Sequence, residues 1–278
     1  MNNFILHHEA AIRLGFFFGL LVLMAAWEVL APRRVLSTPK SARWVTNLSI
    51  VVLNTLLLRL LLPAAAVGVA ALATQRHWGV FNNLSLSDWL IIAMSVVALD
   101  LTIYLQHVLF HAVPILWRIH RIHHTDLDFD VTTGVRFHPL EIILSLLIKF
   151  SAILVLGTPV MAVLIFEVLL NATSMFNHGN VRLPAVLDRV LRWIVVTPDM
   201  HRVHHSVEDD ETNSNFGFNL PWWDRLFGSY RAQPRAGHEG MIIGIRGFRN
   251  PTHLTLPWLL IQPFIGKITG YAINRRQW

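Results

Sequence analysis

Long runs of apolar residues, separated by short polar segments, dominate residues 14–178 of the chain. Residues 14–30 are apolar except for Glu28 near the end of the run. Residues 89–110 form a similar run that follows Ser87 and Asp88, a pair that is typical of a helix start. An α-helix rises about 1.5 Å per residue, so each run crosses most of a hydrocarbon core about 30 Å thick. The pattern predicts membrane-spanning helices.

A longer apolar run covers residues 45–73 and contains Asn54, Arg59 and Pro63. It fits either one tilted and kinked helix or a pair of helices, and we favour one helix. Arg59 is expected either to pair with a carboxylate inside the bundle or to extend its charged end to the membrane surface.

Two further apolar runs, residues 140–156 and 160–176, are separated only by Gly157, Thr158 and Pro159. A glycine followed by a proline ends one helix and starts the next, so we expect a helical hairpin that enters and leaves on the same side. With the hairpin as one unit, the chain has about four transmembrane helical units. After His178 no run is long enough to span, and residues 257–265 are expected at the membrane interface.

The composition agrees with a membrane protein. Hydrophobic residues make up 54% of the 278 positions and charged residues 14%, against about 25% charged in a typical soluble domain. This excludes an ordinary soluble protein and a disordered one. The N-terminal residues lack a basic segment, so a cleaved signal peptide is not expected.

The net charge of +6 comes almost entirely from arginine, since lysine occurs only at positions 40, 149 and 267. Without a lysine-rich run, a nucleic acid is not an expected partner. Most arginines fall in segments that the predicted topology places on one side, which the positive-inside rule makes the cytoplasmic side. The chain has no cysteine, which excludes disulfides, thiolate metal sites and a cysteine nucleophile.

Histidine is unusually frequent, and most of the 15 histidines are clustered. The sequences HVLFH, HRIHH and HRVHH place eight of them at helical spacing, so we expect each cluster to point its imidazoles in one direction. Neutral imidazole binds iron, copper, zinc and nickel, and eight ligands exceed the needs of one four-coordinate zinc. The pattern therefore indicates two neighbouring metals bound by His107, His111, His120, His123, His124, His201, His204 and His205.

Two isolated histidines flank the predicted hairpin. His138 precedes it and His178 follows it, so the topology returns both to the side of the three clusters. We expect both to be metal ligands as well. The other histidines show no spacing pattern and are expected not to be ligands: His7, His8, His77, His238 and His253.

Supporting residues are predicted from helical periodicity. Asp100 shares one stripe of a helix with Tyr104, His107 and His111. A carboxylate inside a membrane is costly unless it is paired, so Asp100 is expected to orient a metal-bound imidazole. The alternative is a salt bridge between Asp100 and Arg59.

Three more polar residues lie near the predicted ligands. Asn171 lies two turns before His178 and is expected to face the same site. Asp199 and Asp126 adjoin the clusters, where they could either hold histidine N–H groups or cap helices.

At these residues the chain resembles the fatty acid hydroxylase / sterol desaturase superfamily, especially its bacterial sterol-desaturase-like members. The family signature is HxxxH, then HxxHH, then a second HxxHH after a membrane hairpin, and residues 107–111, 120–124 and 201–205 match it in that order. The segments RFHPLE and NLPWWDRLFGSYR are similar as well, and the resemblance covers about residues 98–233. Ser174 stands where a further HxxxH box of the fatty acid 2-hydroxylases would begin, which favours the sterol and alkylglycerol branches.

The resemblance implies a non-haem di-iron membrane oxygenase, with the eight box histidines as ligands and His138 and His178 matching additional family histidines. Such an enzyme uses O2, takes electrons from a separate ferredoxin- or cytochrome-type protein, and hydroxylates or desaturates a C–H bond of a sterol, fatty acyl or alkylglycerol lipid. The implied location is a bacterial inner membrane, with the metals on the cytoplasmic side.

The expected fold is an all-α integral membrane bundle with a cytoplasmic, histidine-rich helical cap that holds a dinuclear metal site. We expect one domain over residues 1–278: spanning helices in 1–87, the histidine-box core in 88–235, and a cytoplasmic or interfacial tail in 236–278. One alternative is a zinc-dependent membrane hydrolase, which needs a carboxylate beside its ligands, as in HExxH. The other is a metal transporter or sensor, whose ionisable residues should line a path through the membrane.

Overall fold

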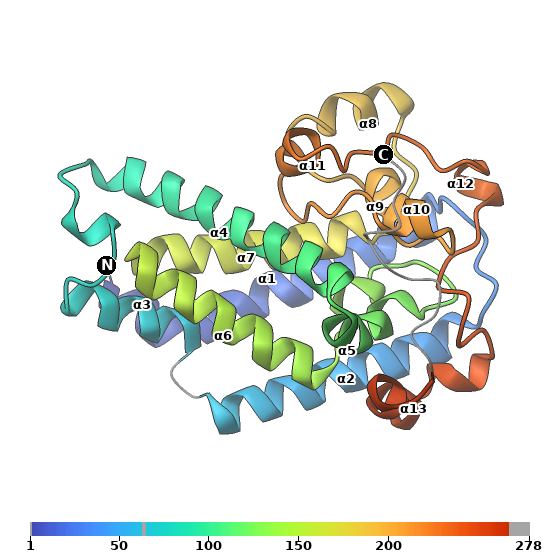
Figure 1. The fold of residues 1–278 in the computed structure, drawn as a ribbon, viewed down its shortest axis with the longest axis horizontal. Helices are drawn as coiled ribbons and strands as arrows, with labels where there is room; N and C mark the ends of the chain where they lie inside the picture. Colours follow the sequence, from blue (N-terminus) through green and yellow to red (C-terminus); the bar gives the residue numbers. More distant parts are fainter. Residues whose placement is uncertain (1, 63–64, 267–278) are drawn as a thin grey trace.

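The chain folds into a bundle of long apolar helices with a polar cap at one end (Figure 1). The structure is a computed structural model that describes residues 2–62 and 65–266, and these residues form helices and connecting loops with no β-strand among them. Five segments are long and apolar enough to cross a membrane. They are α1 (Asn2–Leu30), α2 with α3 (Lys40–Leu61 and Ala65–Gln75), α4 (Asp88–Ala112), α6 (Pro139–Leu156) and α7 (Val160–Asn177). The all-helical membrane fold predicted from the sequence is confirmed.

The apolar run at residues 45–73 contains two helices, where we favoured one. α2 ends at Leu61 and α3 begins at Ala65, while residues 63 and 64 lie outside the described part of the chain. Arg59 is exposed near the end of α2 and forms no ion pair within the described residues. Of the two expectations for Arg59, the structure agrees with a side chain that extends away from the bundle.

The predicted hairpin of α6 and α7 turns at Gly157, which adopts a left-handed backbone with φ +70°. Gly79, in the loop before α4, packs directly on this turn, and a Cβ on it would lie 2.1 Å from the Gly157 nitrogen. The Val80 amide also donates to the Val155 carbonyl at 3.1 Å. The hairpin tip is therefore closed by backbone contacts at the end of the bundle away from the cap.

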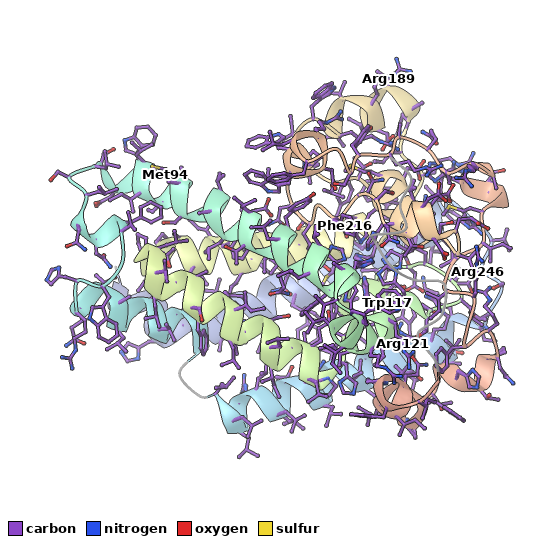
Figure 2. The ribbon with its side chains drawn as sticks, in the orientation of Figure 1. Met94, Trp117, Arg121, Arg189, Phe216 and Arg246 are labelled. Carbon is purple, nitrogen blue, oxygen red and sulfur yellow. The ribbon has the colours of Figure 1, made fainter. Side chains whose placement is uncertain are left out.

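Helix α7 lies at the centre of the bundle, in contact with α1, α3 and α4. Its buried residues Val163 and Phe166 join Leu99 and Ile103 of α4 in the main apolar core. Many other large apolar side chains of the spanning helices are exposed on the outside of the bundle, whose side chains Figure 2 draws as sticks. A surface of this kind is stable in lipid and not in water.

The cap is built from short helices and the loops between them. These helices are α5 (Pro114–His124), α8 (Ala185–Leu191), α9 (Pro198–His204), α10 (Asp209–Thr212), α11 (Trp222–Leu226), α12 (Gly237–Gly240) and α13 (Leu256–Ile261). In α13, Leu259 is buried against Ile50 of α2 and Ile122 of α5. The C-terminal segment expected at the interface thus packs on the outside of the cap.

Buried charges join the cap to the bundle. Arg43 of α2 forms a two-pronged ion pair with Asp126, at 2.7 and 2.8 Å, and a further pair with Asp130 at 2.6 Å. Arg136 donates to the Ile122 carbonyl and to the Asn47 side chain. These contacts fix residues 125–137, the segment between two helices that carry functional groups of the site.

Candidate metal centre

Nine buried histidines meet where the bundle joins the cap, and they form two groups. The first histidine group consists of His107, His111, His120, His124 and His204. The second histidine group consists of His123, His178, His201 and His205. Within each group the candidate ligand nitrogens all lie within 4.8 Å of one another. Each group could hold one metal ion.

Each HxxHH box is divided between the two groups. In α5, His120 and His124 are one turn apart and face the first group, while His123 faces the second. In the other box, His204 belongs to the first group, and His201 and His205 to the second. Consecutive helical residues are about 100° apart, so adjacent histidines diverge. Our expectation that each cluster points in one direction was therefore wrong for the two HxxHH boxes, whereas His107 and His111 both face the first group, as expected.

The nitrogen separations fit shared metal ions. The Nε2 atoms of His107 and His204 are 3.1 Å apart, and His178 Nε2 lies 3.1 Å from Nε2 of both His123 and His201. Two imidazoles bound to one ion at about 2.1 Å, and at right angles, have nitrogens about 3 Å apart. His205 is fully buried, yet neither ring nitrogen has a hydrogen-bond partner among the described residues. A buried polar atom without a partner is costly, and a metal ion would satisfy it.

Backbone carbonyls orient three of the imidazoles. Nδ1 of His107 donates to the Phe216 carbonyl at 2.8 Å, and Nδ1 of His204 donates to the Ser214 carbonyl at 2.7 Å. In the second group, Nδ1 of His178 donates to Ser174 at 2.8 Å. With the proton held at Nδ1, the lone pair of each Nε2 points into the site, the arrangement that metal-binding histidines use.

A carboxylate orients a fourth imidazole. Glu141, in the first turn of α6, lies 2.6 Å from Nδ1 of His120, and both side chains are buried. Our sequence reasoning missed Glu141 as a site residue, although it quoted the RFHPLE segment that ends with it. A glutamate three residues after a histidine and next to a helix start was the available signal. A carboxylate behind a ligand fixes the ring and makes it a stronger base.

Burial keeps the imidazoles neutral. It lowers the pKa of His120 and His178 to about 3, and neighbouring imidazoles lower the pKa of His178 further. Burial and neighbouring imidazoles also hold the pKa values of the other cap histidines well below the usual range, at His123, His124, His201, His204 and His205. The neutral form is the one that binds metals.

Aromatic rings surround the two groups. Phe137 stacks on His123 with ring centroids 4.6 Å apart, and Phe129 stacks on His178 at 5.4 Å. The ring centroids of Trp117 and Phe216, which are labelled in Figure 2, both lie 5.1 Å from that of His111. These rings keep bulk water away from the histidines and lower the local dielectric constant, which strengthens electrostatic interactions there.

The structure does not bring His138 into either group. Its Nδ1 accepts a hydrogen bond from the Leu140 amide and so caps α6, and its Nε2 donates to the Leu260 carbonyl at 3.2 Å. With both nitrogens engaged, His138 acts in this structure as a helix cap. It also places the first turn of α6, and with it Glu141.

Asp100 does not contact a histidine and does not pair with Arg59. Its carboxylate accepts from the Trp223 indole at 2.8 Å and from the Leu220 amide at 3.3 Å. It therefore holds the loop after residue 218 against α4. Asn171 turns back to its own helix and donates to the Glu167 carbonyl, so it does not face the site.

Asp199 and Asp126 pair with arginines and not with a histidine of either group, although Asp199 also lies 3.6 Å from Nε2 of His238. Asp199 binds Arg33 at 3.2 Å and Arg202, and the arginines lower the pKa of Asp199 despite its burial. Asp126 pairs with Arg43, and its pKa lies well below the usual range for the same reason. Both aspartates stabilise the segments next to the histidines.

A second carboxylate missed by the sequence reasoning is Asp224 of α11. It accepts from the Phe216 and Gly217 amides at 2.8 Å each and from the Ser229 hydroxyl. It thereby fixes the loop whose Phe216 carbonyl orients His107. The segment NLPWWDRLFGSYR, which contains Asp224, contributed to the family resemblance but did not indicate that Asp224 positions this loop.

Comparison with known proteins agrees with this site. Residues 92–229 match the model of the fatty acid hydroxylase family, and this range contains all nine histidines. The ornithine lipid hydroxylase OlsE of Rhizobium tropici is 30% identical over 156 residues, 56% of this chain. Alkylglycerol monooxygenase is 28% identical over 142 residues in Xenopus tropicalis and 28% identical over 151 residues in Homo sapiens.

These alignments span less than half of each relative. They cover 46% of the Rhizobium tropici protein, 30% of the Xenopus tropicalis protein and 31% of the human one. No solved structure matches the chain.

Proposed function

Because this chain belongs to the fatty acid hydroxylase superfamily, we propose that it is an O2-dependent membrane oxidoreductase. It holds two iron ions and hydroxylates or desaturates a C–H bond of a lipid. The observation that carries this proposal is the pair of adjacent, buried histidine groups at one end of an apolar bundle. Lipid hydroxylases among the relatives support it.

The donor set favours iron. Five neutral imidazoles in the first group and four in the second are borderline ligands that suit iron as well as zinc. Zinc sites in proteins are almost always four-coordinate, and five imidazoles exceed that number. When bound, the two irons would supply activation of O2 for attack on an unactivated C–H bond.

The chain's own residues would prepare the site. The Phe216, Ser214 and Ser174 carbonyls hold three imidazoles with Nε2 inward, and Glu141 holds a fourth. This removes the need to reorient ligands when metal or O2 binds. Phe137 and Phe129 exclude water on the second group's side. A lipid chain would approach from the bundle, where α4 and α7 lead directly to His111 and His178.

The bundle would be oriented with its histidine end in the cytoplasm of a bacterial inner membrane. Arg33, Arg34 and Lys40 follow α1 at this end, whereas the loop from 76 to 87 at the opposite end holds the single basic residue Arg76 (Figure 1). Electrons for the reaction would then come from a separate cytoplasmic protein of the ferredoxin or cytochrome type.

The two alternative functions have less support. A zinc hydrolase needs a carboxylate that activates water, and neither histidine group includes a carboxylate among the described residues. Glu141 lies behind His120, away from the second group. A transporter should carry polar residues along a path through the membrane, and the nine histidines all lie at one end of the bundle.

The test is turnover of lipids under 18O2. Iron-replete protein in detergent, supplied with a chemical or ferredoxin-type reductant, is offered an alkylglycerol, an ornithine lipid and a fatty acid. We expect one of them to gain a single 18O atom or to lose two hydrogens, with dependence on O2. His201→Ala should abolish the reaction. His138→Asn, which keeps a capping side chain, should retain it. Zinc-dependent hydrolysis, or turnover without O2, would overturn the proposal.

A further inference from the structure

A cavity of about 580 Å³ lies beside α9, outside the two histidine groups. Its walls come from α8, α9, α11 and the segment after α1. Five arginines line it: Arg33, Arg182, Arg189, Arg192 and Arg225. The metal centre does not use this cavity, and no residue of either histidine group lines it.

The cavity has an excess of positive charge. Three carboxylates line it, and each pairs with an arginine: Asp188 with Arg192, Asp199 with Arg33, and Glu239 with Arg182. Arg189 and Arg225 have no carboxylate partner among the described residues. Two positive charges are thus left for an anionic ligand.

Arg192 supplies a buried donor at the cavity wall. Its side chain is 5% exposed, Nε lies 2.7 Å from Asp188, and Nη1 donates to the Ala232 carbonyl at 2.6 Å. Nη2 is buried and has no hydrogen-bond partner among the described residues. A buried guanidinium donor without a partner is costly, and an anion in the cavity would satisfy it.

Arg225 is held rigidly next to Arg192. Its guanidinium carbon lies 3.9 Å from the ring centroid of Trp193 and 4.1 Å from that of Tyr230, and Nη2 donates to the Arg192 carbonyl. Stacking between two rings fixes the plane of the guanidinium without neutralising its charge. The arginines are therefore positioned in advance for a ligand with several oxygen acceptors.

The cavity lies at the depth of the membrane surface. Arg33 comes three residues after Leu30, the last residue of the first candidate span, and Arg182 comes five residues after Asn177, the end of α7. Lipid phosphate groups lie at this depth, next to the ends of the hydrocarbon core.

An exposed apolar surface borders the cavity. On and just after α8, Val186, Val190, Trp193 and Ile194 are all more than half exposed. The Trp222 indole of α11 donates to the Trp193 carbonyl, which joins α11 to this surface. Figure 2 shows Arg189 on the outer side of α8, so apolar and basic side chains share one helix. Such helices lie in the membrane interface, with tryptophan at the headgroup level.

We propose that this cavity binds the phosphate group of an anionic phospholipid, whose acyl chains lie along the exposed apolar side chains of α8 and α11. A phosphate offers several oxygens to the arginine forks, more than a carboxylate can. The bound lipid would seat the cap on the membrane beside α9, which carries ligands of both histidine groups. The inference does not depend on which metal the histidines bind or on the reaction.

The test measures lipid binding to the full-length protein in detergent by native mass spectrometry. The probes are dioctanoyl phosphatidic acid, uncharged dioctanoylglycerol and inorganic phosphate. We expect one phosphatidic acid per chain, with at least about tenfold weaker binding of the other two probes. Equal binding of inorganic phosphate would overturn the lipid assignment, and equal binding of dioctanoylglycerol would overturn the role of the phosphate.

Two variants and a control test the location. Arg189 is exposed and has no ion pair within residues 2–62 and 65–266, so Arg189→Gln should fold normally and weaken phosphatidic acid binding by about fivefold to tenfold. Arg182→Gln should do the same. Arg246, labelled in Figure 2, is 66% exposed and lies outside the cavity, so Arg246→Gln removes the same charge without changing the affinity. An equal loss in all three variants, or in none, would overturn the site.

Discussion

The two histidine groups lie side by side but are supported differently. In the first group, Glu141 and two backbone carbonyls orient three of five imidazoles. In the second group, one carbonyl orients His178, and the outer nitrogens of His123, His201 and His205 have no hydrogen-bond partner among the described residues. Ligand orientation by outer partners commonly changes metal affinity 10-fold to 100-fold. The difference predicts that the first group would hold a metal ion more firmly than the second.

The two HxxHH boxes explain why the two histidine groups are nevertheless coupled. α5 and α9 each contribute ligands to both groups, so a shift of either helix moves both. The difference between the groups therefore comes from partners outside these two helices. The loop with Ser214 and Phe216, and Glu141 of α6, support only the first group, and Ser174 of α7 supports only the second. In the proposed enzyme, a metal ion in the second group would therefore be the more open of the two to O2 and substrate.

The largest effect should come from removing one ligand from each group. His204→Ala should lose the metal of the first group, and His201→Ala that of the second, each with about a 10³-fold or greater loss of lipid oxidation. Elemental analysis should give about one metal per chain in each variant against two in the wild type. Two metals in both variants would contradict the assignment of these residues as ligands.

Glu141→Gln should act on the first group alone. The amide keeps a hydrogen-bond acceptor for His120 but loses the charge, so the affinity of the first-group metal should fall about 10-fold to 100-fold. Chelator titration followed by elemental analysis measures this change. Glu208→Gln, an exposed carboxylate outside the site, is the matched control. An equal weakening of both metals would show that Glu141 supports the cap in general.

Asp224→Asn should have a smaller effect on the same group. Each carboxylate oxygen of Asp224 accepts from one backbone amide, of Phe216 or of Gly217. An asparagine side chain has only one acceptor oxygen, so one of these two hydrogen bonds is lost, at a cost of about 1 kcal/mol. Because this loop orients His107, first-group metal should dissociate a few times faster, which stopped-flow mixing with a chelator would record. Faster loss from the second group alone would contradict this account of the loop.

Mild acid should have the smallest effect. The pKa of His120 and His178 lies at about 3 in the folded protein, against an ordinary value of 6.5. A lowered histidine pKa stabilises the fold above pH 6.5, and this contribution is lost as the pH falls towards 3. Metal content should therefore be unchanged at pH 6 and should fall only below about pH 5, from the second group first. Loss of metal centred near pH 6.5 would indicate exposed histidines instead.

The sequence predicted the spans, the hairpin and the identity of the nine grouped histidines, because helical periodicity and long apolar runs are local signals. It did not predict how each box divides between two groups, since this depends on how α4, α5, α7 and α9 pack. The place of a histidine in the predicted topology does not by itself show that it is a metal ligand, and His138 is an example. It returns to the same end of the bundle, but its neighbouring backbone engages both of its nitrogens.

The supporting groups were the hardest to predict. His120 and Glu141 are 21 residues apart and meet only because α6 begins beside α5. The Ser214, Phe216 and Ser174 carbonyls have no side-chain signature at all. Asp100 lies on the predicted stripe, but a tryptophan and a backbone amide from a distant loop reach it before any histidine does.

The most direct test of the two-group centre is anomalous diffraction at the iron edge from crystals of iron-replete protein. We expect two peaks, one among His107, His111, His120, His124 and His204 and one among His123, His178, His201 and His205. His138 should lie outside both coordination spheres. A single peak, or a peak coordinated by His138, would contradict the two-group centre.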